Sequence, residues 1–87
     1  RARGLRGRDG IGGALVLSPC RSVHTLGMRF AIDVAYLDEQ GVVIKITRMR
    51  RNRIGWPVWK ARTVVEAAAG AFERWGLQVG QQLELRE

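Results

Sequence analysis

The chain has 87 residues, 46% of them hydrophobic, and its fifteen Lys and Arg outnumber its eight Asp and Glu to give a formal net charge of +7. This length fits one domain with a single modest core, which excludes a multidomain enzyme and argues against a large cofactor pocket. The apolar content excludes a disordered chain. The apolar runs are far shorter than the roughly 20 residues that cross a bilayer, so we expect neither a transmembrane segment nor a signal peptide.

Basic charge is concentrated in the first two thirds of the chain. Thirteen of the fifteen basic residues are Arg, and thirteen lie within residues 1–62. Guanidinium groups bind carboxylate and phosphate through paired hydrogen bonds, so this composition predicts either an anionic partner or a solvated basic surface that aids solubility. Cys20 is the single cysteine and cannot form an internal disulfide, which favours a reducing, cytoplasmic compartment.

The clearest secondary-structure signal is a β-hairpin over residues 30–47. Alternation over residues 30–38 predicts a strand that is covered on both faces, and residues 42–47 alternate in a second strand after a turn with the sequence Asp-Glu-Gln-Gly. Upstream, the apolar run 14–17 predicts a short strand. The Gly- and Arg-rich stretch 1–13 predicts a loop with at most a short turn of helix.

The second half of the chain is less clearly patterned. Residues 48–60 are interrupted by Gly and Pro and predict a basic loop. Farther along, β-branched residues favour a strand over 63–67 followed by a short helix over 71–75, but apolar residues at helical spacing support one continuous helix equally well. Gly76 stands where a left-handed helix cap is expected, and residues 82–86 alternate as a final strand.

Three separated blocks of sequence match one protein family in order and spacing. The blocks are Arg-Gly-Leu-Arg-Gly-Arg at 3–8, the run 28–38 together with Gly41, and the run 64–70 together with Gly-Leu-Gln-Val-Gly at 76–80. Across nearly the whole chain they resemble the prokaryotic family called domain of unknown function 192. The resemblance implies a compact, mostly β fold of sandwich or barrel type, with a strand rather than a helix before Gly70. It implies no reaction.

The chain departs from the family pattern in three places. Residues 24–28 read His-Thr-Leu-Gly-Met where the family often has Trp-Met-x-Asn-Thr, and they resemble a His-Thr-x-Gly-Met branch of the family. In the other two places, Ala31 stands where the family has a Pro and Gln81 where it has an Asp. Family members usually have strand sequence upstream of the Arg-Gly-Leu block, so the resemblance implies a missing N-terminal strand and an uncovered sheet edge. We therefore expect a single, mostly β domain over residues 1–87, with one short helix and a β core over residues 14–87.

Asp33 is the residue that we single out for function. Arg29 and Asp33 would share one strand face with only alanines beside them, so a guanidinium and a carboxylate would line a floor with open space above. If Arg8, Thr25 and Glu66 converge there, the five residues form a charge-balanced pocket for a small anionic or zwitterionic ligand. The alternative is a structural ion pair. In both cases we predict a guanidinium near Asp33, donated by Arg29 or Arg8.

Cys20 and His24 raise the possibility of catalysis or metal binding. A thiolate nucleophile needs a nearby base, and zinc binds both side chains, but one Cys and one His complete only half a zinc site. We therefore predict no metal and no cofactor. A small hydrolytic enzyme with Asp33 and His24 as acid and base remains an alternative. The glycines of residues 7–13 lack the Lys-Ser/Thr and the strand–helix context of a phosphate-binding loop.

Basic and aromatic residues are interleaved between residues 48 and 62. Single-stranded nucleic-acid binders use this combination for phosphate contact and base stacking, although an acidic protein or an anionic membrane would be bound by the same residues. Tryptophans in a small domain usually cap the core, so we expect both of these to be buried. The residues concerned are Arg48, Arg50, Arg51, Arg53, Trp56, Trp59, Lys60 and Arg62.

From the sequence we predict a non-enzymatic binding domain that holds a small anionic or polar ligand, or an anionic partner, near the strand of Asp33. Two alternatives stay open. The hydrolytic enzyme is the second choice, and single-stranded nucleic-acid binding through residues 48–62 is the third and is not favoured.

Overall fold

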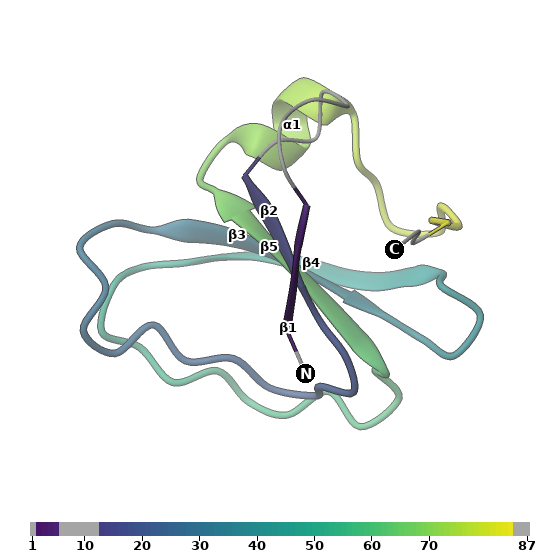
Figure 1. The fold of residues 1–87 in the computed structure, drawn as a ribbon, viewed down its shortest axis with the longest axis horizontal. Helices are drawn as coiled ribbons and strands as arrows, with labels where there is room; N and C mark the ends of the chain where they lie inside the picture. Colours follow the sequence, from purple (N-terminus) through teal and green to yellow (C-terminus); the bar gives the residue numbers. More distant parts are fainter. Residues whose placement is uncertain (1, 6–12, 85–87) are drawn as a thin grey trace.

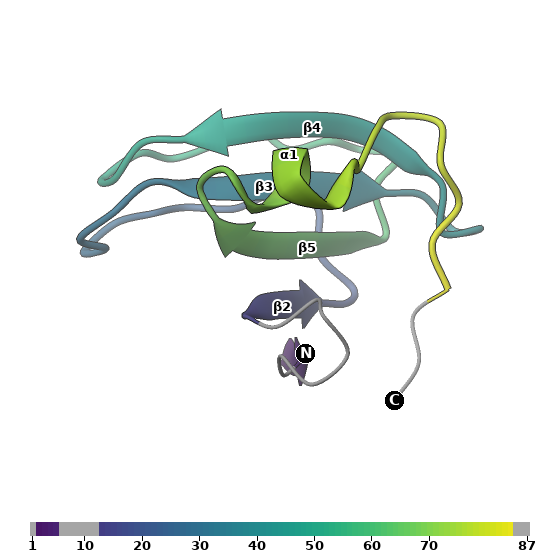
Figure 2. The same cartoon turned by 90° about the horizontal axis from the view of Figure 1, so that it is seen from above.

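The computed structural model describes residues 2–5 and 13–84, which form β-strands and one short helix, as the sequence predicts. Neighbouring strands are all antiparallel, and their order across the sheet is β1-β2-β5-β3-β4 (Figures 1 and 2). No helix of the described residues is long and apolar enough to cross a membrane. The elements are β1 (Ala2–Leu5), β2 (Ala14–Leu17), β3 (Ile32–Leu37), β4 (Val43–Met49), β5 (Thr63–Ala68) and α1 (Ala71–Trp75).

The sheet is open, which corrects the expected sandwich or barrel. Among the described strands, β1 and β4 form the two edges of a single sheet. The helix lies on one side of the sheet and the long loops 18–31 and 50–62 lie on the other (Figure 1). These loops are rich in turns and contain Gly, Pro and Asn, residues that do not sustain a strand, so they cover the sheet without forming a second one.

The predicted hairpin is confirmed as β3 and β4. Every residue of β3 is buried, so this strand is covered on both faces. At the turn, the Oδ1 of Asp38 accepts hydrogen bonds from the backbone N–H groups of Gln40 (2.9 Å) and Val42 (3.0 Å). Gly41 completes the turn with a φ of 81°, in the left-handed region that glycine adopts without strain. The strand begins at Ile32 rather than two residues earlier.

The strand and helix expected after residue 62 are confirmed as β5 and α1, and Gly76 caps the helix in the left-handed conformation. The predicted final strand over 82–86 is wrong where the structure describes it. Gln82 forms only an isolated bridge with Val42, and residues 83–84 are not in a strand. Residues 85–86 lie outside the described residues.

The loop expected over residues 1–13 is wrong at its start. Residues 2–5 form β1 and pair with β2 in the register Ala2↔Leu17 to Leu5↔Ala14, while residues 6–12 lie outside the described part. Glycine and arginine give this segment little strand propensity of its own. The ladder with β2 satisfies the backbone hydrogen bonds and overrides that weak preference.

Two apolar clusters divide the core between the faces of the sheet. On the face that carries α1, called the helix face, Ala35, Leu37 and Val65 pack with Phe72, and Leu83 joins them. On the opposite face, called the loop face, the core is built on alternate strand residues and on side chains from both loops. Its buried members are Val23, Ile32, Val34, Tyr36, Met49, Ala61 and Val64.

Candidate functional site

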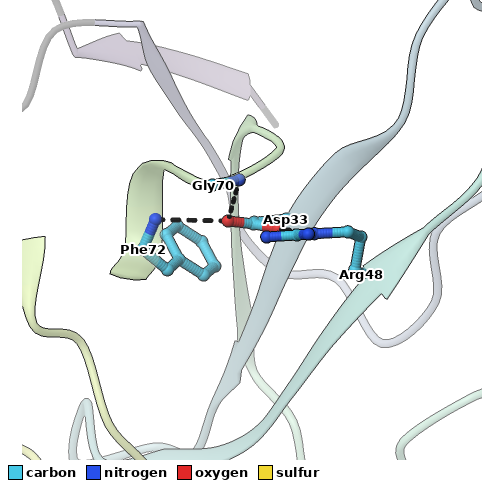
Figure 3. Close-up of polar contacts among 4 residues, drawn as sticks. All are labelled: Asp33, Arg48, Gly70 and Phe72. Atoms are coloured by element: carbon cyan, nitrogen blue, oxygen red, sulfur yellow. Dashed lines mark hydrogen bonds and ion pairs between the residues drawn. The ribbon is translucent and has the colours of Figure 1, made fainter. Parts of the chain in front are cut away.

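Asp33 lies on the helix face with only 4% of its surface exposed. Its Oδ1 accepts a hydrogen bond from the Nε of Arg48 at 3.0 Å (Figure 3). Its Oδ2 accepts two more, from the backbone N–H groups of Gly70 (2.9 Å) and Phe72 (3.2 Å). The predicted guanidinium is therefore present; among the described residues its donor is Arg48 rather than Arg29, and Arg8 lies outside them.

These contacts make Asp33 a cap for α1. The residue at the N-cap position is Gly70, which has no side chain to accept the unpaired N–H groups of the first helical turn. A carboxylate supplied by the neighbouring strand β3 satisfies two of them, and its negative charge suits the positive end of the helix. The ion pair with Arg48 ties the same carboxylate to β4. These contacts favour the structural alternative for Asp33.

The four described residues of the predicted pocket do not come together. Arg29 is exposed in a bend before β3, and Arg8 lies outside the described residues. Glu66 pairs across the sheet with Val34, which alternates with Asp33, so Glu66 lies on the loop face and Asp33 on the helix face. Thr25 belongs to the loop that covers the loop face.

Cys20, His24 and Glu66 are on or near the loop face, but their bonds do not form a catalytic constellation. The thiol of Cys20 donates to the carbonyl of Ser22 (3.1 Å), and the Nδ1 of His24 accepts from the backbone of Leu26 (3.3 Å). Burial raises the pKa of the half-buried Glu66 carboxyl, and the nearby charge of His24 opposes that rise. In the described part of the chain no three His, Cys, Asp or Glu are placed to hold a metal ion.

The proposed acid–base pair of Asp33 and His24 is not assembled either. Asp33 faces α1, whereas His24 is exposed in the loop that covers the other face and forms a bridge with Ile54. A general acid and base must both reach the same substrate atoms, so this arrangement gives the hydrolytic alternative no support.

Thr25 holds the basic loop in place. Its fully buried Oγ1 donates to the carbonyl of Arg50 (2.6 Å) and accepts from the N–H of Arg53 (2.9 Å), while its backbone N–H bonds the carbonyl of Arg53 (2.7 Å). Asn52, in the left-handed region with a φ of 58°, accepts the N–H of Gly27 through its side chain at 2.9 Å.

Two more backbone hydrogen bonds join the basic loop to the segment before β3, and with those of Thr25 they form a ladder between the two segments. The N–H of Gly55 bonds the carbonyl of Val23, and the N–H of Val58 bonds the carbonyl of Arg21, both at 2.8 Å. The segment that carries the basic and aromatic residues is therefore fixed against the segment before β3.

The two tryptophans of this loop are exposed, which corrects the expectation that they cap the core. Trp56 is 86% and Trp59 is 74% exposed. The core on this face is built from other side chains, among them Val23, Met49 and Val58. Large exposed aromatic groups on a small domain have no packing role, so they mark a candidate interaction surface.

Trp56 stands beside a hollow of about 360 Å³ between β4 and the loop that follows it. Lys45, Arg50 and Arg53 contribute positive charge, and no acidic residue lines the hollow among the described residues. Arg48 also borders it, but its guanidinium is bonded to Asp33. We call Lys45, Arg50, Arg53 and Trp56 the Trp56 site.

A second hollow, of about 450 Å³, lies beside Trp59 and is lined on one side by the basic residues Arg21, Lys60 and Arg62. Asp38 and Glu39 from the hairpin turn line it as well, so its charge is mixed. Among the described lining residues, the Trp56 site is therefore the more positively charged of the two. Of the sequence-predicted basic residues, Arg51 is exposed and lines neither hollow.

Sequence comparisons place the chain in a known but uncharacterised group. The family model DUF192, described as "Uncharacterized ACR, COG1430", matches residues 1–85. A similar curated protein is the UPF0127 protein PF1050 of Pyrococcus furiosus, which is 38% identical over 63 residues, covering 72% of this chain and 54% of that protein. The chain thus spans about half the length of this relative. No solved structure gave a significant match.

Proposed function

This chain belongs to the DUF192 family, and because that family is described only as uncharacterised, we propose a function from geometry: the domain binds an anionic ligand that carries a flat ring, at the Trp56 site. The single observation that carries the proposal is the hollow beside Trp56, where Lys45, Arg50 and Arg53 meet an almost fully exposed indole. Guanidinium groups bind phosphate or carboxylate, and an exposed indole stacks on rings.

The site keeps part of the predicted location. Tyr36 of β3 lines the hollow, so the ligand would lie against the same strand that carries Asp33, on its opposite face. The ammonium of Lys45 sits 6.0 Å from the centre of the Tyr36 ring, a cation–π distance that holds this positive charge at the wall of the hollow. A small polar ligand near β3 is therefore retained from the sequence-based prediction, with different contact residues.

Preorganisation supports a binding role. Thr25 and the ladder of backbone bonds fix the carbonyls and N–H groups of residues 50–58, so little loop ordering is left to oppose binding. A merely solvated basic loop needs no such buried hydroxyl at its base.

The proposal is tested by calorimetric titration with thymidine 5′-monophosphate, which combines a ring and a phosphate. We expect binding that is weaker for thymidine and for inorganic phosphate, because each provides half of the contacts. Arg53→Gln should lower the affinity about fivefold. Arg74→Gln, which removes the same charge from an exposed position on α1, is the matched control and should leave the affinity unchanged. Equal effects of both variants would contradict the proposal.

A further inference from the structure

The surface around residues 50–62 repeats one arrangement twice: each of its two tryptophans stands next to a hollow with basic residues, although Asp38 and Glu39 also line the second hollow. The first unit is the Trp56 site, and the second combines Trp59 with Arg21, Lys60 and Arg62. A small ligand needs one such unit. A polymer that repeats a ring and a phosphate uses both.

From this repetition we propose that the partner of this surface is a single-stranded nucleic acid, with bases stacked on Trp56 and Trp59 and the intervening phosphates on the arginines. The inference rests on the function proposed above for the Trp56 site and extends it to the neighbouring unit.

Spacing along the chain fits a short stretch of nucleic acid. Two residues, Pro57 and Val58, separate the tryptophans, so their Cα atoms lie at most about 11 Å apart. Pro57 restricts the backbone between them, and the bond from the N–H of Val58 to the carbonyl of Arg21 anchors the middle of the segment. Both stacking platforms are thus held on one short, fixed support.

A single strand suits the surface better than a duplex. Trp56 and Trp59 contact bases only where the ring faces are accessible, and in a duplex those faces are stacked on one another. The described chain has one helix, α1, of five residues on the opposite side of the sheet, so it presents no recognition helix for a major groove.

Anionic membranes are the main competing partner. Leu26, Phe30 and Ile54 are 52%, 60% and 74% exposed and belong to the same pair of loops as the tryptophans. Insertion into lipid requires protruding apolar groups but no hollow lined with charge. A base stacked on either indole would lie beside a hollow with basic residues, an arrangement that favours bases over lipid.

The inference is tested by fluorescence anisotropy with a labelled oligodeoxythymidylate of about twelve nucleotides, within the usual size of a single-strand site. We expect tighter binding than for thymidine 5′-monophosphate, and a log–log salt dependence with a slope of about −0.7 for each phosphate contacted. Trp56→Ala should weaken binding about 5- to 150-fold. Trp59→Ala should weaken it less, because acidic residues share its hollow.

Two variants on the helix face serve as controls. Trp75→Phe retains an aromatic ring beside Phe72, and Arg74→Gln removes one exposed charge, so both should bind the oligonucleotide like the unaltered chain.

The possible failures separate the two proposals. If the monophosphate binds but the oligonucleotide binds no more tightly, the nucleic-acid inference is wrong and the proposed function stands; if neither binds, both are wrong. If the chain binds vesicles that contain phosphatidylserine and the oligonucleotide does not compete with that binding, the inference is overturned in favour of a membrane. Binding of a duplex as tightly as of a single strand would overturn it too.

Discussion

The two faces of the sheet differ in whether their charged side chains are buried or exposed. On the helix face, Asp33 is buried and its carboxylate is fully engaged by Arg48, Gly70 and Phe72. On the loop face, positive charge and indole rings stand in solvent over a core that smaller side chains have already filled. A buried charge with several partners stabilises structure, whereas exposed charge beside an exposed ring is accessible to a ligand. Both faces carry core, and the comparison places the buried, paired charge on the helix face and the proposed binding site on the loop face.

The largest effect on stability should come from Asp33→Ala. It leaves the N–H groups of Gly70 and Phe72 without an acceptor at a buried helix start, at a cost of roughly 3 kcal/mol. Arg48→Ala removes the other half of the ion pair but should cost less than about 1 kcal/mol, because the Arg48 side chain is 55% exposed. Urea unfolding measures both. Equal costs would show that the ion pair, rather than the helix cap, is the important contact.

Gly41→Ala should be the next most destabilising change. At a φ of 81° an added Cβ would be strained, and it would lie 2.7 Å from the carbonyl oxygen of Leu83, which packs on the helix-face core. We expect a loss of about 2 kcal/mol. Binding at the Trp56 site should be unaffected under native conditions. A combined loss of stability and of ligand affinity would mean that the two faces are coupled.

Thr25→Val probes the loop face alone. Valine keeps the shape but leaves the carbonyl of Arg50 and the N–H of Arg53 without their hydroxyl partner, at a cost of about 1–2 kcal/mol. Because this hydroxyl positions the loop, the affinity for thymidine 5′-monophosphate should fall as well. Thr25→Ser keeps the hydroxyl and should rescue the affinity. If the valine variant binds normally, the loop does not need this support.

Glu66→Gln should have the smallest effect, and one that depends on pH. Burial raises the pKa of Glu66 in the folded chain above its ordinary value of 4.5, so the folded chain holds this proton more tightly than the unfolded chain. Stability therefore falls as pH rises from about 4.5 through the raised pKa and then stays level. The glutamine variant should be more stable than the unaltered chain at pH 7 and equal to it near pH 4. Urea unfolding at the two pH values measures this, and an advantage at both would exclude titration of Glu66 as its cause.

Alternation and turn chemistry were sufficient to predict the hairpin, because its residues specify strand and turn locally. The hairpin also indicates the partner of Asp33, because its register places Arg48 directly opposite Asp33. That register is hard to derive from the sequence, because it shifts by a residue between Tyr36 and Leu37. Residue propensities did not decide between a strand and a helix for the β5 segment, and the family resemblance favoured the strand that the structure shows.

Other features depend on contacts that sequence patterning does not reveal. Strand β1 forms from a segment of low propensity because β2 offers it a ladder. Thr25 was expected to touch a ligand and instead fixes a loop, since its hydrogen bonds reach residues 25 and 28 positions away. The exposure of Trp56 and Trp59 depends on which side chains form the core, a tertiary property that composition cannot supply.

The most direct test of the division between the faces is to measure oligodeoxythymidylate affinity and melting temperature together for Trp56→Ala and Asp33→Asn. We predict that Trp56→Ala lowers the affinity and leaves the melting temperature nearly unchanged, because Trp56 is 86% exposed. Asp33→Asn should lower the melting temperature by roughly 5 °C or more and leave the affinity of the folded protein unchanged. The reverse pattern, with binding lost in folded Asp33→Asn and retained in Trp56→Ala, would contradict the assignment.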